Sequence, residues 1–124
     1  MLELKEDLEK IRFYFQSKRL SREEIELKIV EEKLEFLLEK VRLEASLLRN
    51  NECCEDTKKR MYLEASDMII LDFNYNCLDI QFIETVAKKF AEENEIRLDR
   101  LIAALKEKSE ILLKRIEEGY YDKV

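Results

Sequence analysis

Apolar residues recur at helical intervals along nearly the whole chain of 124 residues. In the first segment, Leu4, Leu8, Ile11 and Phe15 follow one another at steps of four, three and four residues. Residues at these steps lie on one face of an α-helix, so the pattern predicts a first helix over residues 2–18.

The second segment has the clearest start signal. Ser21 is followed three residues later by Glu24, which is the arrangement of a capping box, and a helix is predicted from there to about residue 50. One apolar row of this helix follows the repeat of a coiled-coil seam and consists of Leu27, Val30, Leu34, Leu37, Val41 and Leu48. A second row, which repeats every seven residues, consists of Ile29, Phe36 and Leu43.

The two rows together cover an arc of about 200° on a helix that turns by ~100° per residue. A single neighbouring helix does not cover so wide an arc. We therefore expect this long helix either at the centre of a bundle or shared with a second subunit. Ile29, Phe36 and Leu43 are the predicted interface residues of a homodimer.

The rest of the chain continues the helical pattern. The apolar spacing predicts a third helix over residues 58–72 and a last helical segment over 79–118, which breaks between residues 93 and 97 because the apolar phase shifts there. Gly119 is placed to end the last helix. We predict an all-α protein, an antiparallel up-and-down bundle of four or five helices with a long central second helix. Residues 1–119 form its single domain and residues 120–124 a C-terminal tail.

Composition supports this fold and narrows the partners. The chain has no proline and one glycine, whereas sheets with tight turns usually need such residues. A net charge of −6 argues against nucleic acid and anionic membranes as partners. No apolar run approaches the about 20 residues of a membrane-spanning helix, and the N-terminal residues are too charged for a signal peptide. We expect a cytoplasmic protein.

The residue types that are missing exclude several kinds of chemistry. Without histidine, histidine-containing zinc sites and Ser-His-Asp triads are excluded, and a single glycine excludes a phosphate-binding loop. Cys53, Cys54 and Cys77 are expected to be ordinary reduced thiols with no assigned role. The helix over residues 58–72 would separate the first two from the third, so a three-cysteine metal site within one subunit is not expected.

Two carboxylate motifs carry the most specific chemical signal. Glu32-x-x-Glu35 and Glu64-x-x-Asp67 each place two acids about one turn apart on a helix, and two such helices can hold Mg²⁺ between them. The pair of motifs resembles the ExxE and ExxD pattern of the all-α nucleoside triphosphate pyrophosphohydrolases, the MazG-like family. The resemblance implies that these four acids bind magnesium and that the substrate is a nucleoside triphosphate.

A helical wheel supports a different interpretation of the first motif. It places Glu32 and Glu35 roughly opposite the apolar arc, where they would form a solvated acidic surface. Two other acids, Glu44 in the coiled-coil seam and Asp72 on the inner face of the third helix, are the candidates for buried polar residues.

The leading functional hypothesis is therefore a non-enzymatic interaction or assembly protein. It would bind itself or another helical protein through its apolar helix face, with no catalytic residue, metal or cofactor. The magnesium-dependent hydrolase is the alternative.

Overall fold

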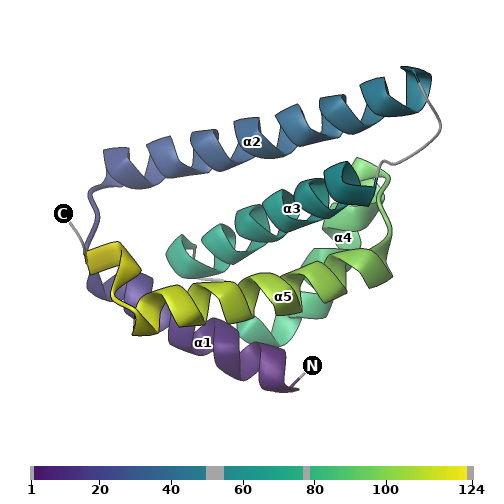
Figure 1. Ribbon diagram of the computed structural model, residues 1–124. Coiled ribbons are helices and arrows are strands. Elements are labelled where there is room, and N and C mark those ends of the chain that lie inside the picture. The colour runs from purple at the N-terminus through teal and green to yellow at the C-terminus, as the bar shows by residue number, and fades with distance from the viewer. Residues whose placement is uncertain (1, 50–54, 77–78, 123–124) are drawn as a thin grey trace.

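The computed structural model describes residues 2–49, 55–76 and 79–122. These residues form the helices α1 (Leu2–Ser17), α2 (Arg22–Arg49), α3 (Glu55–Tyr75), α4 (Ile83–Asn94) and α5 (Leu98–Glu117), with two short 3₁₀ helices, η1 (Ile80–Phe82) and η2 (Tyr120–Asp122) (Figure 1). The predicted all-α helical bundle is confirmed, and no strand occurs in the described ranges. Cys53, Cys54 and Cys77 lie outside the described residues.

The third helix, rather than the second, holds the centre of the bundle. α3 packs against α1, α2 and α5, and in Figure 1 it lies between α2 on one side and α5 and α1 on the other. Its inner residues Ala65, Ile69 and Phe73 are each at most 1% exposed. On the longer α2, only Phe36 and Glu39 are buried. The expectation of a central second helix is corrected, because α2 covers one side of the bundle with a single face.

The face that α2 turns inward is the row that we had assigned to a dimer interface. Phe36 is 2% exposed, and its ring packs on Phe90 of α4 with the ring centres 5.4 Å apart. Leu43 packs against the same core, and Ile29 is half-buried. Phe36 and Leu43 therefore belong to the core of their own chain, and Ile29 stays a prediction as an interface residue.

The coiled-coil row of α2 faces outward instead. Its six members are between 42% and 89% exposed. We call this row the outer face of α2, and it consists of Leu27, Val30, Leu34, Leu37, Val41 and Leu48. At ~100° per residue, Leu34 lies about 200° around the helix from Glu32, so the outer face and Glu32 are on opposite sides of α2.

The helix ends follow their sequence signals. The Glu24 backbone N–H donates to Ser21 Oγ at 3.2 Å, which caps α2 as predicted. Gly119 follows α5 with a φ of +69°, a conformation that glycine adopts without strain. The described part of the predicted tail folds back as η2, where the Tyr14 hydroxyl donates to Asp122 Oδ1 at 2.9 Å.

One of the two candidates for buried polar residues is corrected. Glu44 is exposed, because it lies beside the outer face of α2. Asp72 is half-buried, and its Oδ1 accepts a hydrogen bond from Asn76 Nδ2 at 3.0 Å.

No helix in the described ranges is both long enough and apolar enough to cross a membrane.

Two phenylalanines test this arrangement. Phe36→Ala should lower the free energy of unfolding by about 3–5 kcal/mol, because it leaves a cavity in a closed core. The same change at Phe13, which is 79% exposed on α1, should cost no more than about 0.5 kcal/mol. Urea unfolding of both variants measures the difference. Equal costs at the two positions would contradict the inward orientation of Phe36.

Candidate carboxylate metal centre

Contacts between α2 and α3 define how these two helices lie against each other. Glu39 of α2 accepts a hydrogen bond from Arg60 of α3 at 3.5 Å. Glu32, seven residues before Glu39 on α2, lies beside Asp67, which is seven residues after Arg60 on α3. The order of partners is therefore reversed along the two helices, so this pair is antiparallel. Such a register brings Glu-x-x-Glu of one helix to Glu-x-x-Asp of the other.

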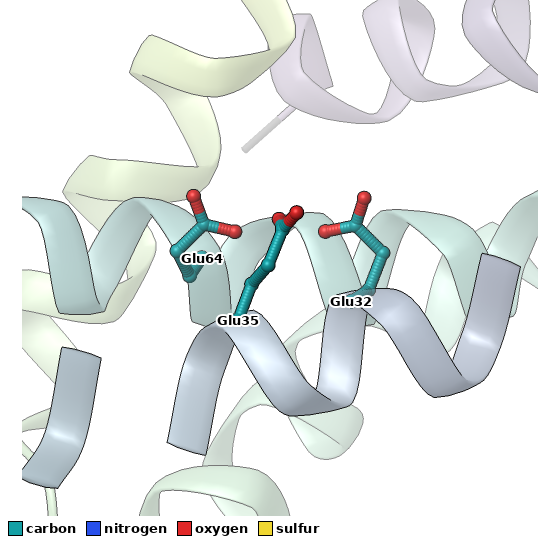
Figure 2. A group of neighbouring side chains, drawn as sticks. All are labelled: Glu32, Glu35 and Glu64. Atoms are coloured by element: carbon teal, nitrogen blue, oxygen red, sulfur yellow. The ribbon is translucent and has the colours of Figure 1, made fainter. Parts of the chain in front are cut away.

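Three carboxylates meet between these helices. One oxygen from each of Glu32, Glu35 and Glu64 lies within 4.8 Å of the other two. Figure 2 shows Glu32 and Glu35 projecting from α2 and Glu64 from α3, with the Glu35 carboxyl group between the others. The expectation that both acids face water is corrected for Glu32, which is half-buried, whereas Glu35 is exposed as expected and still reaches the cluster. Both acids lie within one turn of Phe36, so the rotation that buries Phe36 turns them toward α3.

Asp67 completes the set that the sequence motifs named. It lies one turn beyond Glu64 on α3, and its Oδ2 accepts from Lys108 Nζ of α5 at 3.0 Å. The side chains of this pair are 19% and 11% exposed. The sequence analysis missed Lys108, although a lysine placed between Leu105 and Leu112 on an apolar helix face is a signal for a buried charge partner.

Burial and neighbouring carboxylates raise the pKa values of three of these acids, Glu32, Glu64 and Asp67. Burial, helped by the carboxylates of Asp67 and Glu35, raises the pKa of Glu32 from its ordinary 4.5 to about 7. Burial, with Asp67 and the adjacent Glu35 carboxyl group, raises the pKa of Glu64 to about 7. Burial also raises the pKa of Asp67, and Lys108 opposes that rise. Without a further cation, the site carries more acid groups than it can keep ionised at neutral pH.

The donor set fits a hard divalent cation. Carboxylate oxygens are the ligands that Mg²⁺ prefers, and two oxygens bound to one Mg²⁺ lie at most about 4.2 Å apart. Small side-chain rotations from the observed 4.8 Å would meet this limit. Buried oxygens of Glu32 and Glu64 (Oε2 in each) also have no hydrogen-bond partner. Buried polar atoms without a partner are rare, so both oxygens are available as ligands.

A cavity of about 270 Å³ adjoins the cluster, with Glu32 and Asp67 in its wall. It lies between α1, α2, α3, α5 and η2. Two cationic side chains, Lys28 and Arg115, also line it. The remaining wall is mostly aromatic or apolar, and its aromatic members are Phe15, Tyr75, Tyr120 and Tyr121. The acid cluster therefore lies at the edge of a space that a small ligand can enter.

Comparison of the chain with protein-family models, with curated proteins and with solved structures found no match. The resemblance to the MazG-like pyrophosphohydrolases thus rests on the two carboxylate motifs. What the structure adds is their geometry. Three of the four motif acids converge within 4.8 Å, and the fourth, Asp67, lies beside them.

The raised pKa values predict how stability depends on pH. Between pH 4.5 and about 7, Glu32 and Glu64 keep protons in the folded chain that the unfolded chain has already lost. Their contribution to the free energy of unfolding is therefore largest below pH 4.5 and is lost as the pH rises to about 7. The double variant Glu32→Gln/Glu64→Gln should lack this decline and melt several degrees higher than the native chain at about pH 8.

Thermal melting across this pH range, in buffer without divalent cations, measures the effect. Glu44→Gln is the matched control, because Glu44 is an exposed glutamate on the same helix. The control should keep the native pH profile. If the double variant and the native chain shared one profile, the two carboxyl groups would not be coupled as described.

Proposed function

We propose that this protein is a magnesium-dependent hydrolase of nucleoside triphosphates. The reaction adds one water and yields a nucleoside monophosphate and pyrophosphate, as the resemblance to MazG-like enzymes implies. The observation that carries the proposal is the convergence of Glu32, Glu35 and Glu64 from two helices at the edge of a cavity. A nucleotide substrate agrees with the cytoplasmic location expected from the sequence.

The charges around the cluster support a phosphate-bearing substrate. Bound Mg²⁺ would supply positive charge to the phosphate oxygens at the point of cleavage. Lys28 and Arg115 line the cavity beside the acids, so they can neutralise the phosphates that extend beyond the cation. Lys108 lowers the pKa of Asp67 against the effect of burial and thereby favours the ionised carboxylate that a cation needs as a ligand.

The proposal predicts a metal response and a loss of activity from the same substitutions. Millimolar Mg²⁺ should raise the melting temperature of the native chain and support release of pyrophosphate from a nucleoside triphosphate. Replacing a residue that only orients a metal ligand lowers metal affinity or activity by about 10–100-fold. Glu64→Gln with Asp67→Asn changes the proposed ligands themselves, so it should lower kcat/KM by at least about 100-fold. The same double variant should lose the magnesium-induced shift.

The matched control is Glu31→Gln, an exposed glutamate next to Glu32 on α2. It should keep both the shift and the turnover. A native chain that shows neither a melting shift with Mg²⁺ nor pyrophosphate release from any of the common nucleoside triphosphates would contradict the proposal.

The outer face of α2 supports a second proposal, that two copies of this chain associate through it. Six exposed apolar side chains on one helix face are unusual for a surface exposed to water, and their spacing is that of a coiled-coil seam. A second copy offers the same face, so the two helices can interlock with each other. Because Glu32 lies on the opposite side of α2, association leaves the acid cluster accessible. Self-association and hydrolysis are thus compatible.

Sedimentation tests the second proposal. The native chain should sediment with twice the mass of one chain, and Leu34→Glu with Val41→Glu should reduce it to a single chain, since two charges would enter an apolar contact. Leu2→Glu is the control, because Leu2 is 73% exposed on α1, away from this face. A native chain that stays monomeric at high concentration would exclude the association.

A further inference from the structure

The cavity beside the acid cluster has an end that the proposed hydrolysis leaves unexplained. Away from Glu32 and Asp67, its wall consists mainly of rings and apolar side chains. Phe15 of α1 and Tyr121 of η2 lie edge to face there, with ring centres 5.1 Å apart. Such a wall is well suited to a flat apolar ring, and Arg115, the cation at this end, lies over the ring of Tyr120.

The contacts of η2 hold the aromatic part of this wall in place. Asp122 accepts hydrogen bonds from the Tyr14 hydroxyl and from Lys18 Nζ, both near the end of α1. Tyr121 packs against Phe15, and Tyr120 lies against Arg115 with the guanidinium carbon 5.1 Å from the ring centre. The rings are thus positioned by the fold before any ligand arrives.

Two polar atoms in the same wall have no partner. Asn74 is 4% exposed, and its Oδ1 makes no hydrogen bond. The buried hydroxyl of the next residue, Tyr75, also makes none. Burial raises the pKa of Tyr75, so the hydroxyl stays protonated and can donate. Buried polar atoms are nearly always paired, and two consecutive unpaired ones in one cavity therefore indicate a ligand that supplies the missing hydrogen bonds.

We propose that this end of the cavity binds the nucleobase of the nucleotide, with Asn74 and Tyr75 as the residues that select it. The inference rests on the proposed function for the phosphate end of the substrate. A carboxamide presents an acceptor and a donor side by side, which complements the edge of a base, and aromatic side chains stack on its faces. The cavity, at about 270 Å³, is smaller than the range of about 300–1,000 Å³ that encloses whole drug-sized ligands. It therefore takes the base, while the phosphates extend past Glu32 toward the acid cluster.

Binding without catalysis tests this assignment. The affinities of adenosine, cytidine, guanosine and uridine 5′-monophosphates are compared with that of ribose 5-phosphate by calorimetry, in the absence of Mg²⁺. At least one monophosphate should bind about tenfold more tightly than ribose 5-phosphate. Asn74→Leu should abolish this advantage, and Tyr75→Phe, which removes only the hydroxyl, should reduce it.

Melting temperatures separate a binding effect from a folding effect. Both variants remove buried atoms that have no partner, so each should melt at or above the native temperature. The controls are Asn76→Leu, an exposed asparagine just after α3, and Tyr62→Phe, a tyrosine outside this cavity wall whose hydroxyl accepts from the Arg97 backbone N–H. Both controls should keep the native preference for the monophosphate.

Two results would overturn the assignment. One is equal binding of ribose 5-phosphate and all four monophosphates by the native chain. The other is an unchanged base preference in both Asn74→Leu and Tyr75→Phe. Failure of the hydrolase proposal is separate. Glu64→Gln should lose turnover and keep the base preference, and a native chain that prefers a base without any turnover would support this inference and reject hydrolysis.

Discussion

The rotation of α2 about its own axis decides what the two faces of this helix do. Phe36 fixes that rotation, because its ring enters the core and packs on Phe90 of α4. Lys40, one turn further along, donates to the backbone oxygen of Asn94 at 3.0 Å and holds the same orientation. Glu32 and Glu35 lie on the same side of Phe36, within about 100° of it around the helix, so both reach Glu64 of α3, and the apolar outer face turns away. The acid cluster and the exposed apolar face are therefore two consequences of one packing contact.

Without a bound ligand, this arrangement lowers the stability of the folded chain. Burial and mutual repulsion raise the pKa values of Glu32 and Glu64 to about 7, although Lys108, the ion-pair partner of Asp67, opposes the rise at Glu32. Asn74 Oδ1 and the Tyr75 hydroxyl are buried without partners in the adjoining cavity. Sequences that are selected only for stability avoid both features, whereas binding sites commonly contain them. The two sets of strained groups lie in one connected region, and this common location supports a shared ligand.

The helices themselves were largely predictable from the sequence, and the rotation of α2 was not. Periodicity and the cap at Ser21 placed the helix boundaries within a few residues, because these signals are local. The two apolar rows of α2 compete for the core, and the regular coiled-coil row suggested the wrong packing face. The packing of one large ring, Phe36, against Phe90 of α4 decides between them. A helical wheel contains no information on this contact with another helix. Three of the four motif acids lie close together in the structure, but their meeting depends on the register of α2 against α3. Lys108 and Asn74 were missed, since each is a single polar residue within an apolar pattern.

The central claim is that the acids of α2 and α3 form one cation site because the rotation of α2 brings Glu32 and Glu35 to α3. A crystal structure of the native chain grown with Mn²⁺, which binds the same oxygen ligands as Mg²⁺ and gives an anomalous signal, tests it most directly. We predict one strong anomalous peak between Glu32, Glu35 and Glu64, with Phe36 buried beneath it. A map with no peak at this position, or an α2 whose acids point to solvent while Leu34 and Val41 enter the core of their own chain, would contradict the account.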